Sequence, residues 1–197
     1  MMAKYKVNEI FYSLQGEGRW GGRAAIFVRF SGCNLKCPFC DTDFKAFTLM
    51  GEQDILREMQ SLSEACRFVV FTGGEPTLQV DEALVSLLKE HGYYIAMETN
   101  GTHLVPAGID WVTCSPKSQF VGNGKVVLAH ASEVKVVFDG EHEISDQGID
   151  AQYYYVQPCD VGNEEKNAEI LKQTIRFVEE HPKWQLSIQL HKVLNIR

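Results

Sequence analysis

Short apolar runs alternate with amphipathic stretches along this chain of 197 residues. Most of the apolar runs are continuously hydrophobic, which is typical of strands buried on both faces of a sheet. The predicted strands are 24–30, 68–72, 94–98, 111–115, 134–138, 153–157 and 185–189, and the predicted helices are 53–62, 81–91 and 164–181. Strands that alternate with helices predict a parallel sheet with right-handed crossovers.

The number of helices limits the kind of α/β fold. The segments 116–132 and 139–151 lack the apolar periodicity of a strong helix. A complete eight-fold barrel takes about 250 residues and is too long for this chain. We therefore predict an α/β fold that is an incomplete, partly open TIM-like barrel of parallel strands with few helices. The length suits one hydrophobic core, so we expect a single domain over residues 1–197.

Polar and glycine-rich segments follow the predicted strands at their carboxyl ends. In chain order they read SGCNLKCPFC, GGEP, ETNGT, SPK, QPCD and QLHK. The carboxyl rim is where parallel α/β barrels form their active sites. Strand ends also lead into polar turns that have no function, but here many chemically capable groups would converge on one rim. We expect the functional site there.

Three of the six cysteines lie within eight residues, in the segment GCNLKCPFCD. Cys33, Cys37 and Cys40 have no second Cys/His pair at zinc-finger spacing, whereas closely spaced cysteines on one loop are typical ligands of iron–sulfur clusters. Three cysteines on a 4Fe–4S cluster leave one iron open for a substrate or cofactor. The alternatives are chance clustering and a zinc-binding interaction module. Such a module predicts one zinc and no absorbance near about 400 nm.

The spacing Cys-x3-Cys-x2-Cys after a first strand resembles that of the radical S-adenosylmethionine (SAM) superfamily, and TGGEP after the second strand agrees with it. Over nearly the whole chain, the motifs NEIFYSLQGEG, AAIFVRFSGCNLKCPFCDTDF, TGGEPTLQ, METNGT, CSPK and SIQLHKVLNIR resemble the 7-carboxy-7-deazaguanine synthase family. The resemblance implies a carbon–nitrogen lyase that converts 6-carboxy-5,6,7,8-tetrahydropterin to 7-carboxy-7-deazaguanine. Ammonia is released in this early step toward queuosine.

The resemblance also implies three cofactors: a 4Fe–4S cluster on Cys33, Cys37 and Cys40, SAM, and Mg²⁺. In the superfamily, the open iron takes the amino and carboxylate groups of SAM. One electron from the reduced cluster then cleaves SAM to methionine and a 5′-deoxyadenosyl radical. The protein positions this radical against one hydrogen, here that on C6 of the pterin. Ring contraction and nitrogen loss follow, and return of the hydrogen lets SAM act catalytically.

Further residues match family positions at the substrate and the magnesium ion. Thr42 matches a position whose hydroxyl binds Mg²⁺, although alone it would be taken as a turn residue. Arg29 can hold the substrate carboxylate in two hydrogen bonds, with a surface salt bridge as the alternative. His191 is a pocket wall, a general acid or a structural histidine. The other substrate positions are Leu14, Gln15, Gly16, Glu17, Thr72 and the terminal residue Arg197.

The SAM positions lie after later strands. The resemblance places Gly74 and Glu75 at the methionine end. It places Ser115, Pro116 and Lys117 near the ribose and carboxylate, and Gln157, Pro158, Cys159 and Asp160 near the adenine. Glu98 and Asn100 either support the site or cap a turn. We also expect the N-terminal segment 1–23 and the tail 185–197 to complete the substrate pocket.

The composition limits which binding partners and which cellular location are expected for the protein. A formal net charge of -7 disfavours nucleic-acid binding. The chain has no apolar stretch approaching the roughly 20 residues that cross a bilayer and no signal-peptide core, so we expect a cytoplasmic protein without membrane contact. The resemblance implies a homodimer and an electron donor such as flavodoxin or ferredoxin. A glycyl-radical activase would share the cysteines and GGEP but act on a protein; the LQGEG segment and the tail argue against it.

Overall fold

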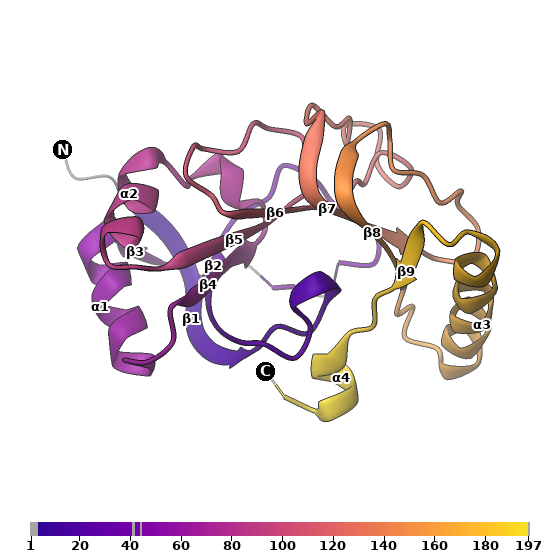
Figure 1. Ribbon diagram of the computed structural model, residues 1–197, viewed down its shortest axis with the longest axis horizontal. Helices are drawn as coiled ribbons and strands as arrows, with labels where there is room; N and C mark the ends of the chain where they lie inside the picture. The colour runs from indigo at the N-terminus through magenta and orange to yellow at the C-terminus, as the bar shows by residue number, and fades with distance from the viewer. Residues whose placement is uncertain (1–3, 41, 44, 197) are drawn as a thin grey trace.

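A computed structural model describes residues 4–40, 42–43 and 45–196 (Figure 1). Within these residues, nine strands form one curved sheet in the order β3-β1-β2-β4-β5-β6-β7-β8-β9. The strands are β1 (Tyr5–Leu14), β2 (Ala24–Phe30), β3 (Thr48–Met50), β4 (Phe68–Gly73), β5 (Tyr94–Thr99), β6 (Trp111–Cys114), β7 (His130–Phe138), β8 (Asp150–Pro158) and β9 (Trp184–Leu186). From β2 to β9 neighbouring strands are parallel, and β1 pairs antiparallel with both β2 and β3. The sheet has two ends, so the predicted open barrel is confirmed.

The long helices cover the outside of the sheet. They are α1 (Glu52–Leu62), α2 (Glu82–Glu90) and α3 (Glu164–Glu180), and a short helix, α4 (Leu190–Leu194), follows β9. The predicted helices are thus confirmed to within one residue at each end. Asp81, predicted as the first residue of α2, caps that helix instead by accepting a hydrogen bond from the Leu84 amide. Among the described residues, no helix has the length and apolar character needed to cross a membrane.

Several parts of the sheet differ from the prediction: the short strand β3 was not predicted, and β7 and β8 begin four and three residues before the predicted strands 134–138 and 153–157. The strand β1 was not predicted, because its apolar residues alternate with polar ones instead of forming a continuous run. The last strand was predicted over 185–189, but β9 ends at Leu186 and the chain turns into α4. The ring of Trp184 is buried and anchors β9, whereas the next two residues are exposed. The chain then leaves the sheet and contacts the N-terminal segment, where the Leu190 amide donates to the Gly16 carbonyl.

Apolar packing divides the molecule into layers. One core lies between the sheet and the helices α1 and α2, and another lies between β7, β8 and α3 (Figure 1). Inside the curve of the sheet, Phe11, Phe27, Phe68, Val70 and Trp111 form a separate cluster. Trp111 and Phe68 begin their strands, so this cluster fills the amino end of the barrel. The cluster does not fill the carboxyl end of the barrel, so a cavity can form there.

Candidate active site

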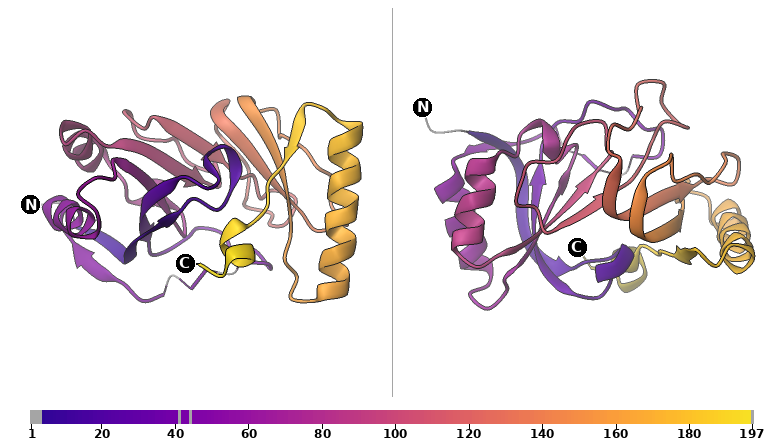
Figure 2. Two further views of the ribbon diagram at one scale, coloured as in Figure 1. Left: turned by 60° about the horizontal axis from the view of Figure 1, so that its bottom comes forward. Right: turned by 45° about the horizontal axis from the view of Figure 1, so that its top comes forward.

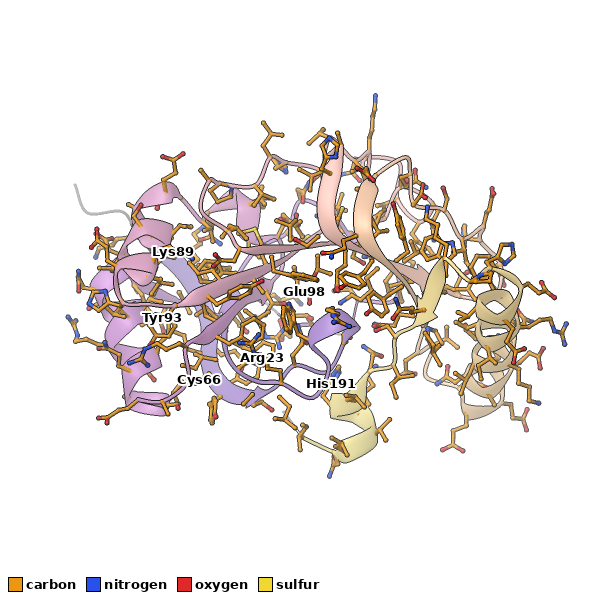
Figure 3. All side chains as sticks on the ribbon, viewed as in Figure 1. Arg23, Cys66, Lys89, Tyr93, Glu98 and His191 are labelled. Carbon is orange, nitrogen blue, oxygen red and sulfur yellow. The ribbon has the colours of Figure 1, made fainter. Side chains whose placement is uncertain are left out.

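A cavity of about 890 Å³ opens at the carboxyl end of the parallel strands. Segments from both ends of the chain border it: the N-terminal segment (indigo) and α4 (yellow) lie on the same side of the sheet in Figure 2. Figure 3 labels Glu98 near the centre of the sheet and His191 at α4, and both line the cavity. The predicted site residues that line it are Leu14, Gln15, Gly16, Glu17, Arg29, Cys33, Cys37, Cys40, Thr42, Thr72, Gly74, Ser115, Lys117, Gln157, Pro158, Cys159, Asp160 and His191.

Two predicted residues, Glu75 and Pro116, are described by the structure and do not line the cavity. Glu75 is 0% exposed, and its carboxylate accepts hydrogen bonds from the Thr99 hydroxyl at 2.8 Å and the Asn100 amide at 2.7 Å. Of the pair predicted at the methionine end of SAM, only Gly74 therefore faces the cavity. Pro116 is buried outside the lining. Arg197 lies outside the described residues.

The cysteine loop presents three free thiols to the cavity. Burial raises the pKa of the Cys33 and Cys37 thiols above the ordinary value, so ligation by iron would release protons. No three His, Cys, Asp or Glu side chains in the described parts of the chain are placed to hold a single metal ion. A cubane cluster is larger and holds its thiolates further apart than one zinc does. Three soft donors on one cavity wall fit such a cluster.

Hydrogen bonds fix the cysteine loop to neighbouring strand ends. Asn34, in the loop, accepts from the Asn100 side chain at 3.0 Å, and its own amide donates to the Thr102 hydroxyl at 2.8 Å. The Asn123 side chain donates to the Asn34 carbonyl at 3.0 Å from the loop after β6. Asn100 is in turn held by the buried Glu75. Glu75 and Asn100 therefore support the loop that carries the cysteines.

The glycines of TGGEP allow this loop to pack directly on β4. The Gly74 amide donates to the Phe30 carbonyl at 3.0 Å, and the Glu75 amide donates to the Gly32 carbonyl at 2.9 Å. A Cβ on Gly74 would lie 1.9 Å from the Gly32 carbonyl oxygen. Gly73 has φ of +122°, and a Cβ there would lie 2.2 Å from the Phe30 carbonyl oxygen. The close approach of backbones requires glycine at both positions.

A buried cation that the sequence analysis missed lies at the centre of the cavity wall. Lys135, on β7, is 4% exposed and donates to Glu17 at 2.5 Å and to Glu98 at 2.7 Å. The Gln15 side chain donates to the other oxygen of Glu98 at 3.1 Å. Gln157 donates to the other oxygen of Glu17 at 3.0 Å. The only sequence signal was a lysine within the predicted strand VKVVF, which is otherwise hydrophobic.

These contacts set the ionisation of Glu17. Burial alone would raise the pKa of its carboxyl group, but the charge and hydrogen bond of Lys135 and the hydrogen bonds from Gln189 and Gln157 outweigh burial. The pKa is lowered to about 2. The two carboxylates in turn raise the pKa of Lys135 above its usual value, against the effect of burial. Glu17 and Lys135 are therefore both charged at neutral pH.

Replacing Glu17 with glutamine is expected to destabilise the fold at neutral pH and much less in acid. The folded pKa of Glu17 lies below the unfolded value near 4.5. Its contribution is therefore fully present above about pH 5 and is lost as pH falls toward 2. Urea unfolding at pH 7 and at pH 3 measures the difference between wild type and variant. A difference that stays constant between the two pH values would contradict this ionisation.

Arg29 and Thr72 are paired neighbours on the strands β2 and β4. Both line the cavity near its rim. The Arg29 Nε donates to Glu9 on β1 at 2.8 Å, so this face of the guanidinium is already paired. The terminal nitrogens are what a substrate carboxylate would use. Thr42 lines the same cavity beside Cys40.

The tail docks on the N-terminal segment through Gly16. The Leu190 amide donates to the Gly16 carbonyl at 3.0 Å. A Cβ on Gly16 would lie 2.6 Å from the His191 Nδ1, so only glycine lets the imidazole come this close. Lys192 pairs with Asp160 at 2.8 Å, and this hydrogen bond is the main reason why the pKa of Asp160 is lowered. The tail thus closes one side of the cavity.

Comparisons with known proteins agree with this geometry. Residues 27–118 match the radical SAM superfamily. The chain is 46% identical to 7-carboxy-7-deazaguanine synthase of Bacteroides thetaiotaomicron over 98% of each chain, and 38% identical to that of Caulobacter vibrioides over 98% of this chain and 99% of the other. The crystal structure of QueE from Escherichia coli superposes with a TM-score of 0.76, at 27% identity and over 95% of each chain.

The predicted enzyme class and its cofactors are confirmed by these relationships. A radical SAM enzyme carries a 4Fe–4S cluster and uses SAM. In this chain the three predicted cysteines and the two glycines of TGGEP line one cavity. The identities exceed 30% over nearly the full length of the curated relatives. The chain therefore belongs to the 7-carboxy-7-deazaguanine synthase family of radical SAM enzymes.

Proposed function

We propose that this chain converts 6-carboxy-5,6,7,8-tetrahydropterin to 7-carboxy-7-deazaguanine with release of ammonia, in deazapurine (queuosine) biosynthesis. One observation carries the proposal: a single cavity is lined by the three cysteines, by the LQGEG segment and by the tail. The cysteines belong to the cofactor and the other two segments to the substrate in this family. Radical and substrate would thus share one enclosed volume, as a hydrogen transfer requires.

The cofactor side of the cavity is formed by the cysteine loop and the later strands. Cys33, Cys37 and Cys40 would hold the cluster, and Gly74 would leave room for the methionine end of SAM. When bound, the cluster and SAM supply the radical that removes a hydrogen from the substrate. Lys117 donates to the Ser115 carbonyl at 2.8 Å and also to the Ser115 hydroxyl, which fixes both side chains at the cavity wall. The backbone of residues 157–160 would read the adenine edge.

The substrate side is formed by the first and last parts of a single radical SAM domain. The N-terminal segment 1–23 and the tail 185–197 complete the pocket around the pterin. Arg29 would bind the substrate carboxylate through its terminal nitrogens. Glu17 would accept hydrogen bonds from amino groups of the heterocycle, since its carboxylate is ionised and faces the cavity. His191 lies against Gly16 and closes that side of the pocket as a steric boundary.

Replacing Thr42 with alanine is expected to slow product formation and to weaken its dependence on Mg²⁺. One hydroxyl together with substrate oxygens and water suits a hard cation that keeps several non-protein ligands. The rate is measured as a function of Mg²⁺ concentration, with an expected loss of about 10- to 100-fold at limiting metal. Thr42→Ser retains the hydroxyl and is the matched control. An unchanged magnesium response in Thr42→Ala would remove Thr42 from the metal site.

The partners follow from the same reaction. The organic substrate is a small pterin, and an electron donor such as flavodoxin or ferredoxin reduces the cluster. The protein acts as a cytoplasmic homodimer and binds neither nucleic acid nor membrane. The net charge of -7 supports the absence of a polyanion site.

The proposal is tested by turnover with the pterin as the only organic substrate besides SAM. Anaerobic protein with a reconstituted cluster is given SAM, reductant and Mg²⁺, and ammonia is followed with and without 6-carboxy-5,6,7,8-tetrahydropterin. Ammonia is expected only when the pterin is present. A requirement for a partner protein, with no ammonia from the pterin, would instead indicate an enzyme that activates another protein.

A further inference from the structure

The buried ammonium of Lys135 joins two carboxylates that come from distant parts of the chain. Glu17 lies in the segment between β1 and β2, and Glu98 lies on β5. The side chains of Lys135, Glu17 and Glu98 are 5%, 18% and 21% exposed, and all three residues line the cavity. Figure 3 labels Glu98 near the middle of the sheet. The group therefore forms part of the cavity wall and not part of the outer surface.

Each carboxylate keeps acceptor capacity after its contacts within the protein are counted. An ionised carboxylate offers about four lone-pair sites. Among the described residues, Glu17 accepts from Lys135, Gln157 and Gln189, while Glu98 accepts from Lys135 and Gln15. Glu98 thus has more unused acceptor sites than Glu17. The unused sites can receive N–H donors from a ligand in the cavity.

Among the described residues, the other charged groups near the Lys135 ammonium do not take over its pairing with Glu17 and Glu98. Glu133, on the same strand, receives the Thr113 hydroxyl at 3.0 Å and the Arg19 amide at 3.0 Å, and burial raises the pKa of its carboxyl group. Lys117, on the loop after β6, donates a hydrogen bond to the Ser115 carbonyl. Lys135 is the cation that contacts both cavity carboxylates among the described residues. Without it, two neighbouring carboxylates would repel each other and keep a proton between them.

We propose that Lys135 is a positioning residue that presents Glu17 and Glu98 to the cavity as paired acceptors, and so sets a preference for ligands whose edge carries an amino group beside a ring N–H. This inference rests on the proposed function, since a 2-amino-4-oxopyrimidine edge of that kind is shared by the pterin and by 7-carboxy-7-deazaguanine. A carboxyl group that kept its proton would place an O–H donor against the N–H donors of this edge. Two donors that face each other cannot form a hydrogen bond, so such a ligand would bind less well. Lys135 acts through the carboxylates and needs no contact with the ligand.

The test measures discrimination between two ligands. Binding of 6-carboxypterin, and of its 2,4-dioxo analogue in which oxygen replaces the 2-amino group, is measured by calorimetry on anaerobic holoenzyme with SAM. Wild type is expected to prefer the amino ligand by about tenfold or more, as for one hydrogen bond to a charged group. In Lys135→Met this ratio should fall to near one. Lys172→Met, at an exposed position on α3, is the matched control and should keep the ratio.

A second variant keeps the inference testable if Lys135→Met does not fold. Glu98→Gln replaces one acceptor oxygen of the carboxyl group that has more unused sites by an NH₂ donor and should lower the same ratio. A variant at Lys135 that weakens both ligands equally, or a Glu98→Gln protein that keeps the wild-type ratio, would overturn the inference while leaving the proposed function intact. Wild-type enzyme that binds neither ligand would overturn both.

Discussion

Replacing Cys40 with alanine is expected to abolish SAM cleavage and leave the fold intact. Cys40 is exposed on its loop and takes no part in the apolar clusters, so the free energy of unfolding should change by no more than about 0.5 kcal/mol. The cluster would lose one of its three thiolates. Iron content, absorbance near about 400 nm and 5′-deoxyadenosine release measure the loss, and thermal unfolding measures the fold. Cleavage should fall to the level of a protein-free control.

The matched control for this variant is Cys66→Ala. Cys66 does not line the cavity of the candidate active site. Its thiol donates to the Phe68 and Ala24 carbonyls, at 3.4 and 3.7 Å, and its side chain packs against two of the apolar clusters. This variant should keep iron, colour and SAM cleavage. SAM cleavage by Cys40→Ala under reducing conditions would contradict the assignment of the cluster to this loop.

Replacing Gly74 with alanine is the second change with a large expected effect. Its Cβ would lie 1.9 Å from the Gly32 carbonyl oxygen and 3.0 Å from the Cys33 amide nitrogen, and both are backbone atoms. The cysteine loop must therefore move away from β4. We expect a loss of about 1–3 kcal/mol in the free energy of unfolding, as for an overpacked site, together with poor assembly of the cluster.

Gly122→Ala provides the comparison for Gly74→Ala, since a Cβ at Gly122 would meet nothing within 4 Å. That variant should match wild type in urea unfolding, iron content and SAM cleavage. If Gly74→Ala unfolds at the wild-type urea concentration and assembles a full cluster, the close packing of the loop on β4 is wrong.

The features that could be predicted from the sequence are those with a local signal. Continuous apolar runs identified the parallel strands, because a strand covered on both faces has no polar side. The three cysteines and TGGEP carry chemistry at fixed spacing. The topology then brings them together, since the carboxyl ends of parallel strands share one rim.

The missed features depend on contacts between distant residues. The strand β1 alternates polar and apolar positions and is held by antiparallel pairing to β2 at the edge of the parallel array. Lys135 looked like an ordinary charged residue until the fold placed Glu17 and Glu98 beside it, which lie 118 and 37 residues away in the chain. Glu75 belongs to the motif TGGEP, yet its carboxylate points away from the cavity and accepts hydrogen bonds from Thr99 and Asn100. Such tertiary partners leave no periodicity in the sequence.

Mass spectrometry of the product decides whether this chain carries out the proposed reaction. Reconstituted protein is incubated anaerobically with SAM, a reductant, Mg²⁺ and 6-carboxy-5,6,7,8-tetrahydropterin. We expect 7-carboxy-7-deazaguanine in the wild-type reaction and none with Cys40→Ala. Release of 5′-deoxyadenosine without this product would contradict the proposed substrate, and a colourless, zinc-loaded protein with neither activity would contradict the radical chemistry itself.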